Sequence, residues 1–334
     1  MRRSLLLCTA VISSVYAVAA GAHDSAGTAG DANAPTNAGE EVLERAIIHR
    51  TVEAVAKARQ AAHHTGAASA APLLAYGGGT GGIGVETAPR LYLVLWGSQW
   101  GNDPSGEAGI LQTFYSGVGG SSWLKSVTQY CQGVPSGTVS CNGAGTPAGD
   151  PYSILVDTVV WHDSSTAPSH PSQSQLAAEA VKAAQHFGNI NATSNASVQY
   201  VIATAHRNNS RGFGTQYCAY HSSTTSGYGN IAYTNLPYIT DAGASCGANF
   251  NGLGADAGIT IVAGHEAGET ITDQFPSTGW TDSGGAENGD KCAWISSGQG
   301  ASANVTFSTG TFPVQSLWSN AFNNGAGGCV LSYP

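Results

Sequence analysis

A histidine and two glutamates stand close together at 264–270, in the run Gly-His-Glu-Ala-Gly-Glu-Thr. If this run is helical, His265 and Glu269 lie one turn apart on the same face, where both side chains can bind one metal ion. The intervening Glu266 can then act as a general base toward a water molecule at that metal. The spacing therefore predicts a zinc site equipped for hydrolysis.

The run departs from the helical metalloprotease motif His-Glu-x-x-His, because Glu269 replaces the second histidine. In zincins whose third ligand comes from a later segment, a glutamate stands at about the distance of Glu287 from the motif. The predicted site has three metal ligands and one base: His265, Glu269, Glu287 and, as the base, Glu266. His221 and His206 are the alternatives for the third ligand.

This prediction depends on the structure of residues 259–273. The run is rich in Ile, Thr, Val and Gly, which have low helix propensity. If residues 259–263 instead formed a strand leading into a turn, His265 and Glu269 would not share a face. A solvated turn is then the alternative, although two glutamates beside a histidine are unusual in a chain with only 10% charged residues.

A second acidic group follows, around three glycines at 284, 285 and 289: Asp273, Asp282, Glu287 and Asp290. Oxygen ligands on a loop bent by glycine suit Ca²⁺, but their spacing is not that of an EF-hand. Glu287 can thus serve zinc, calcium or a structural hydrogen bond. Among the remaining histidines, His162 and His206 each end a predicted apolar strand, a place where α/β sheets often carry sites.

The N-terminus has the features of a secretory signal peptide, since Arg2 and Arg3 precede an apolar run that ends near Ala20. Of the seven cysteines, six lie outside that peptide, and an even number in an exported chain predicts disulfides. The sequence leaves their pairing open, and we expect neighbours to pair: Cys131–Cys141, Cys218–Cys246 and Cys292–Cys329. The predicted location is secreted, either extracellular or periplasmic.

The formal net charge is −9 and the chain has no basic cluster, which argues against nucleic acid as a partner. No segment after the signal peptide is long and apolar enough to span a bilayer, so we expect no membrane association of the mature protein. The predicted partner is a protein or peptide substrate, or alternatively a cell-wall polymer.

Apolar runs alternate with helical patterns, which predicts one α/β (or α+β) domain with a mixed sheet flanked by helices and a zincin-like active helix. The expected organisation is a signal peptide at 1–22, a propeptide or flexible N-terminal segment at 23–82, and a secreted domain at 83–334. The N-terminal segment contains one amphipathic helix over 40–64, which either belongs to a propeptide or packs on the domain. Strands are expected over 90–96, 152–161, 198–205, 231–239 and 304–307, and helices over 106–115, 121–130 and 172–187.

Three further runs resemble the phosphate-induced, EXORDIUM-like family of secreted proteins: Arg-Leu-Tyr-Leu-Val-Leu-Trp-Gly-Ser-Gln-Trp at 90–100, Tyr-Cys-Ala-Tyr-His at 217–221, and Leu-Pro-Tyr-Ile at 236–239 followed by Cys246 and Gly247. The likeness spans roughly residues 89–329 as scattered motifs. It implies a secreted protein, in plants a cell-wall or apoplastic one linked to growth. The His-Glu-x-x-Glu run and Glu-Asn-Gly-Asp-Lys-Cys at 287–292 are similar to the microbial branch, which resembles zinc peptidases in this segment alone.

Two hypotheses follow. The first is a secreted metal-dependent hydrolase, a zinc metalloendopeptidase in which Glu266 is the general base. The second is a non-catalytic, extracellular EXORDIUM-like protein that binds cell wall or polysaccharide and has a loop stabilised by Ca²⁺.

Overall fold

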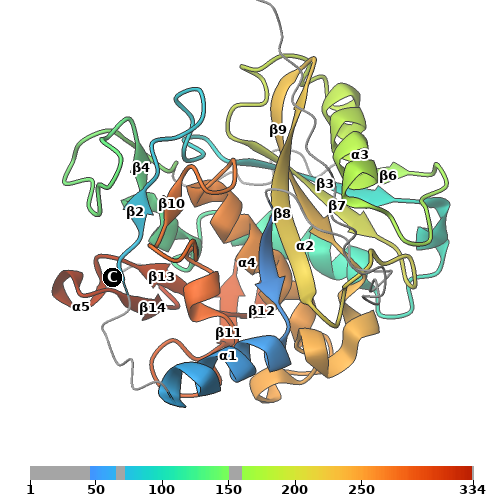
Figure 1. The fold of residues 1–334 in the computed structure, drawn as a ribbon. Coiled ribbons are helices and arrows are strands. Elements are labelled where there is room, and N and C mark those ends of the chain that lie inside the picture. Colours follow the sequence, from blue (N-terminus) through green and yellow to red (C-terminus); the bar gives the residue numbers. More distant parts are fainter. Residues whose placement is uncertain (1–45, 65–71, 150–159, 333–334) are drawn as a thin grey trace, which may run out of the picture. The chain divides into compact units, whose positions relative to one another are not determined.

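The computed structural model describes residues 46–64, 72–149 and 160–332. Within these residues, six strands form one sheet in the order β1-β8-β9-β7-β3-β6 (Figure 1). β3 pairs in parallel with β6 and β7, and β7 pairs in parallel with β9, whereas β8 is antiparallel to both β9 and β1. This mixed sheet confirms the predicted fold class. The strands are β1 Ile47–Arg50, β3 Arg90–Trp96, β6 Trp161–Asp163, β7 Val198–Thr204, β8 Tyr217–Ser226 and β9 Gly229–Leu236.

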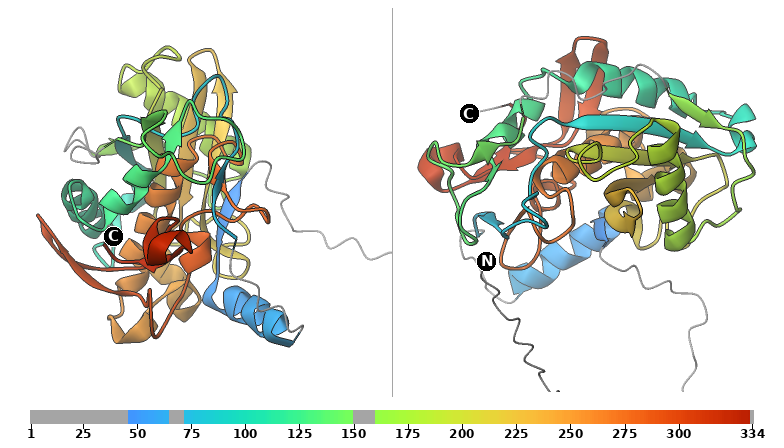
Figure 2. Two further views of the ribbon diagram at one scale, coloured as in Figure 1. Left: turned by 90° about the vertical axis from the view of Figure 1, so that its left-hand side faces the viewer. Right: turned by 90° about the horizontal axis from the view of Figure 1, so that it is seen from above.

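Helices cover both faces of the sheet. They are needed on both faces because the side chains of β3 alternate between two apolar cores. Leu91 and Leu93 point into one apolar core, whereas Tyr92 and Val94 point into a second, because successive strand residues face opposite sides. The first core also contains residues of α2 (Glu107–Val118) and α4 (Ala257–Thr272), and the second contains residues of α3 (Gln173–His186). Figure 2 shows β3 running between α2 and α3.

The segment with the predicted motif is helix α4, and all 16 of its residues are buried. Its glycines allow close packing: Gly258 lies against the main chain of Cys246, Gly264 against Trp123, and Gly268 against Leu317. Tertiary packing therefore overrides the low helix propensity of the run. The alternative of a strand leading into a turn is excluded.

Four two-stranded sheets complete the strand structure of the described residues: β2 Ala75–Tyr76 with β10 Trp280–Thr281, β4 Cys131–Gln132 with β5 Thr146–Pro147, β11 Ala303–Phe307 with β12 Gly310–Val314, and β13 Leu317–Ser319 with β14 Gly328–Val330. The other helices are α1 Val52–His64 and α5 Phe322–Gly325, with 3₁₀ helices η1 Ser98–Gly101, η2 Leu124–Gln129, η3 Ile239–Cys246, η4 Phe250–Gly252 and η5 Asp290–Cys292. Among the helices that the structure describes, none is long and apolar enough to cross a membrane.

Three disulfides lie at bonding distance and join Cys131 to Cys141, Cys218 to Cys246, and Cys292 to Cys329. This pairing of neighbours is the one that we predicted. Disulfides of this kind are typical of proteins that fold in an oxidising compartment.

Most elements predicted within the domain lie close to their expected bounds, and those over 90–96, 172–187, 198–205 and 304–307 agree within one or two residues. The helix expected over 121–130 is instead the shorter 3₁₀ helix η2. Of the strand expected over 152–161, residues 152–159 lie outside the described residues, and β6 begins at Trp161. The predicted signal peptide also lies outside them.

The helix predicted over 40–64 is wrong at residues 47–50, which form strand β1 on the edge of the sheet. Helix α1 begins only at Val52, after Thr51, whose hydroxyl accepts a hydrogen bond from the amide of Ala54. The edge of β8 offers backbone partners that an isolated helical pattern cannot reveal, and pairing there overrides the local preference. Part of the 23–82 segment therefore packs on the domain.

Gly258 offers a test of the packing of α4. A Cβ at this position would overlap the carbonyl oxygen of Cys246, so we expect Gly258→Ala to lower the free energy of unfolding by about 1–3 kcal/mol. In the matched control, Gly109→Ala in α2, the new Cβ meets nothing within 4 Å. Here we expect a gain of about 0.5–1 kcal/mol from helix propensity. Denaturant unfolding followed by circular dichroism measures both, and equal effects would contradict the close packing.

Candidate metal centre

Helix α4 places the predicted motif in the interior, where His265, Glu266 and Glu269 are all fully buried. His265 Nε2 lies 3.1 Å from Glu269 Oε1, as expected for residues one helical turn apart. These two side chains thus share a face of the helix, as the metal-site prediction requires.

Strand β8 brings a second imidazole to the same place. His221 Nδ1 lies 3.3 Å from Glu266 Oε2 and 3.6 Å from Glu269 Oε2. The two carboxylate oxygens of Glu269 therefore face two different histidines, His265 through Oε1 and His221 through Oε2. The sequence marked His221 only as an alternative ligand, because its strand was not predicted.

The loop that follows α4 adds two more carboxylates. Glu287 Oε2 lies 3.5 Å from His221 Nε2, and Asp290 Oδ1 lies 3.9 Å from His265 Nε2. The backbone amide of Asp290 also donates to Glu269 Oε1 at 2.8 Å. The structure therefore brings all four predicted site residues together and adds His221 and Asp290 to them. We refer to these six residues as the buried cluster: His221, His265, Glu266, Glu269, Glu287 and Asp290.

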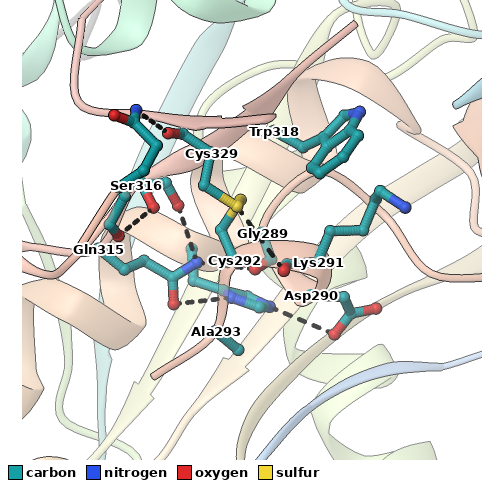
Figure 3. Close-up of a disulfide and its surroundings, with 12 residues drawn as sticks. Gly289, Asp290, Lys291, Cys292, Ala293, Gln315, Ser316, Trp318 and Cys329 are labelled. Atoms are coloured by element: carbon teal, nitrogen blue, oxygen red, sulfur yellow. Dashed lines mark hydrogen bonds and ion pairs between the residues drawn. A yellow bond between two sulfur atoms is a disulfide. The ribbon is translucent and has the colours of Figure 1, made fainter. Parts of the chain in front are cut away.

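Gln315 orients the imidazole of His265 and was missed at the sequence level. Its Nε2 donates to the carbonyl oxygens of Gly289 and Ser316, which leaves Oε1 facing His265 Nδ1 at 3.3 Å (Figure 3). Gln315 Oε1 can only accept here, so a proton on His265 Nδ1 suits this contact and Nε2 is the nitrogen that faces Glu269 and would be available to a metal. No local motif could have revealed Gln315, because it lies 50 residues from His265 in the chain.

Gly289 is required next to the same imidazole. A Cβ at this position would lie 2.7 Å from His265 Nδ1 and 2.9 Å from Glu269 Oε1. The neighbouring disulfide, Cys292–Cys329, joins the chain that follows Gly289 to β14 (Figure 3). The loop can therefore approach α4 closely and is covalently held there.

Polar atoms of the buried cluster lack hydrogen-bond partners, although solvent does not reach them. They are His221 Nε2, His265 Nε2, Glu266 Oε1, Glu269 Oε2 and both carboxylate oxygens of Glu287. Four of these atoms still face an oppositely charged side chain at 3.1–3.6 Å, whereas Glu266 Oε1 and Glu287 Oε1 do not, and leaving a buried polar group unpaired costs about 1–3 kcal/mol. A cation between them would satisfy several at once, and His221, Glu266 and Glu269 can each offer one ligand atom within 4.8 Å of the others.

Electrostatics also favours a cation. Burial alone would lower the pKa of His265, but the carboxylates of Glu269, Glu266 and Asp290 together outweigh it and raise the pKa to about 9. Burial raises the pKa of Asp290 to about 7, with Glu269 adding to the effect, and burial raises the pKa of Glu287 well above its ordinary value. In the absence of a metal, the cluster must hold protons, which a divalent cation would displace.

The other candidates from the sequence lie elsewhere. His206 pairs with Asp241 through Nδ1 at 2.5 Å, and His162 is exposed. Asp282 accepts the amides of Gly284 and Ala286 in its own loop and pairs with Lys291. Among the described residues, the groups spaced to hold a metal include Asp290 but not Asp282.

A run Gly-Ala-Ser-Cys-Gly at 243–247 matches the Gly-x-Ser-x-Gly pattern of serine hydrolases. In the structure it spans the end of the 3₁₀ helix η3 rather than a turn between a strand and an α-helix. Its Cys246 is bound to Cys218. The run therefore does not form the nucleophile elbow that this chemistry needs.

Comparisons of the chain with models of known protein families, with curated proteins and with solved structures find no match. The resemblance to EXORDIUM-like proteins therefore remains a prediction, and the chemistry of the site must be argued from its own geometry.

Metal content tests the centre directly. We expect the purified protein to carry near-stoichiometric zinc, and His265→Ala to lose it because a ligand is removed from a buried site. His162→Ala is the matched control, since this histidine is exposed and its replacement should leave the zinc content unchanged. Plasma mass spectrometry gives the content. Zinc that persists in His265→Ala, or calcium alone in all three proteins, would contradict the centre described above.

Gln315 allows a test of the orientation of His265. We expect Gln315→Leu to weaken zinc binding by about 10–100-fold, the usual effect of removing a group that orients a ligand. Gln299→Leu is the matched control, because Gln299 bonds the carbonyl of Cys329 and does not touch the cluster. Competition with a chelator measures the affinity, and equal affinities in the two variants would refute the orienting role.

Proposed function

We propose that this protein is a secreted, zinc-dependent hydrolase, most simply a metalloendopeptidase. The observation that carries this proposal is the position of Glu269 between the imidazoles of His221 and His265, with Glu266 beside them. Together these side chains supply ligands and a base in one buried place.

The donor set fits zinc better than calcium. Zinc accepts imidazole nitrogen and carboxylate oxygen, whereas calcium is bound by oxygen ligands alone. We assign His221, His265 and Glu269 as the ligands, because Glu269 belongs both to a group of possible ligands that contains His221 and to one that contains His265, and so joins them. Glu287 then faces the far nitrogen of His221 and positions that ring, in place of the ligand role expected from spacing.

Zinc bound here would polarise a substrate carbonyl and lower the pKa of a water molecule. Glu266 is the base of the proposal, because its Oε1 has no hydrogen-bond partner and is free to accept a proton. Burial raises the pKa of Glu266, which moves it toward the range in which one carboxyl group both takes and returns a proton. Glu266 would hold the proton of the attacking water and pass it to the departing amine.

The class of substrate follows from this chemistry and from the predicted export. The three disulfides and the predicted signal peptide support function outside the cytoplasm, where exported peptidases act on proteins and peptides. A cell-wall polymer remains the alternative substrate.

One observation favours a different function. Apart from Asp290, every residue of the buried cluster is fully buried, as a structural metal site would be. The second candidate is therefore a non-catalytic extracellular protein, of the cell-wall-binding type, whose metal ion stabilises the fold.

Glu266→Gln separates the two functions. We expect it to keep zinc but to lower the rate of hydrolysis of denatured casein by about 10²–10⁴-fold, because only the base is removed. Glu179→Gln is the matched control, a buried glutamate of α3 on the other face of the sheet. All proteins are assayed after the chain has been cut between residues 64 and 72, for the reason given in the next subsection. If zinc-loaded wild type hydrolyses neither casein nor a peptide library, the structural-metal function is the better account.

A further inference from the structure

Strand β1 is the edge strand of the sheet, and it lies beside the strand that carries His221 of the buried cluster. It pairs with β8 in a register that sets Ile47 opposite His221 and His49 opposite Ala219, so that all four side chains lie on one face of the sheet. That face is the one on which α4 packs, as α4 contacts both β8 and β1. In Figure 1, β1 stands beside β8 with α4 next to both.

His49 reaches the centre itself. Its ring stacks on that of His265, with ring centres 3.7 Å apart and planes inclined by 2°. One atom each of His49, His265 and Glu266 lies within 4.8 Å of the others. The pairing shifts register after His49, an irregularity of the kind that re-aims side chains next to active sites.

The ring of His49 is stacked on Trp294 as well as on His265, which explains its packing but not its polar atoms. Its side chain is fully buried, yet neither ring nitrogen has a hydrogen-bond partner. A histidine that served only to fill the core would be expected to bond at least one nitrogen. His49 also lies next to Glu266, the proposed base.

The segment that carries His49 is attached through the pairing of β1 with β8 and through three hydrogen bonds, two of which come from Arg59 of α1. Arg59 donates to the carbonyl oxygens of Ala293 and Trp294, and Trp294 donates to that of Arg50. No residue from 52 to 62 is fully buried. A cleft of about 720 Å³ separates α1 from the loop at 282–293, so the helix covers this region without sealing against it.

The edge of β8 that β1 occupies could instead bind another extended chain. An edge strand presents backbone amides and carbonyls that a second strand can pair with, whatever its side chains. If β1 left, this edge would run past His221 to the rest of the cluster. A polypeptide bound there would pass over the proposed zinc and base.

We propose that residues 46–64 are an intramolecular inhibitor: β1 occupies the place of an extended polypeptide substrate on the edge of β8, and His49 blocks the metal centre. This inference rests on the proposed function and names its substrate class. It also accounts for the burial of the cluster, because the structure then represents the latent enzyme.

The test uses the full chain with residues 65–71 replaced by the recognition sequence of a site-specific protease. The zinc-loaded protein is cut, the release of the N-terminal fragment that contains residues 46–64 is followed by size-exclusion chromatography, and the rate of zinc transfer to a chelator is measured before and after. We expect release to speed transfer by about tenfold or more, because the cover and a nearby imidazole are lost. Casein hydrolysis should begin in the same sample.

A synthetic peptide of residues 46–64 provides the reverse test. Added to the cut protein, it should restore slow zinc transfer and stop hydrolysis, and the same peptide with His49→Ala should be about tenfold weaker, since it lacks the blocking group. In the uncut chain, His49→Ala should also speed zinc transfer, whereas His162→Ala should not. Circular dichroism confirms that both variants are folded.

The outcomes separate the two proposals. A fragment that stays bound without denaturant would show that β1 is a permanent strand and would overturn the inference. The inference would also be overturned if release of the fragment left the rate of zinc transfer unchanged, or if His49→Ala did. If release speeds zinc transfer and the peptide reverses it but no polypeptide is cleaved, the cover is supported and the metalloendopeptidase proposal fails.

Discussion

The carboxylate of Glu269, held between two imidazoles in the interior, is the interaction on which the site depends. Charged groups removed from water are costly unless they are paired or bound to a metal. Helix α4 can bury such groups only because its glycines let the surrounding chain pack against it without gaps. The glycines that lower the helix propensity of α4 are therefore the same residues that allow its charged side chains to be buried.

The surroundings of this interaction come from distant parts of the chain. β8 contributes His221, and the loop before η5 contributes Glu287 and, at Gly289, the room for both side chains of α4. The Cys292–Cys329 disulfide and Gln315 hold that loop and the imidazole of His265 in place. Each imidazole therefore has one nitrogen directed toward Glu269 and the other toward a polar side chain, an arrangement typical of metal ligands.

The proposed covering role of β1 would reconcile the buried centre with the proposed hydrolytic function. A sheet edge next to reactive groups is exposed to unwanted pairing with other chains, and a strand of the same chain removes that risk. In this protein β1 also brings His49 onto His265, so that one element protects the edge and closes the site. The segment is attached through the four paired residues of β1 and through the two hydrogen bonds of Arg59 in α1, whose residues 52–62 include none that is fully buried.

The sequence by itself determined whatever depends on neighbours along the chain. The spacing of His265 and Glu269 follows from the helical repeat, and the strand at 90–96 follows from its apolar run. The cysteine pairing was open in the sequence, and the structure shows that nearest neighbours pair. Only the tertiary structure decided that His221 faces Glu269, that Gln315 orients His265, and that residues 47–50 are a strand carrying His49. These contacts join residues far apart in the chain, and they arise from strand register and from burial, neither of which a local pattern encodes.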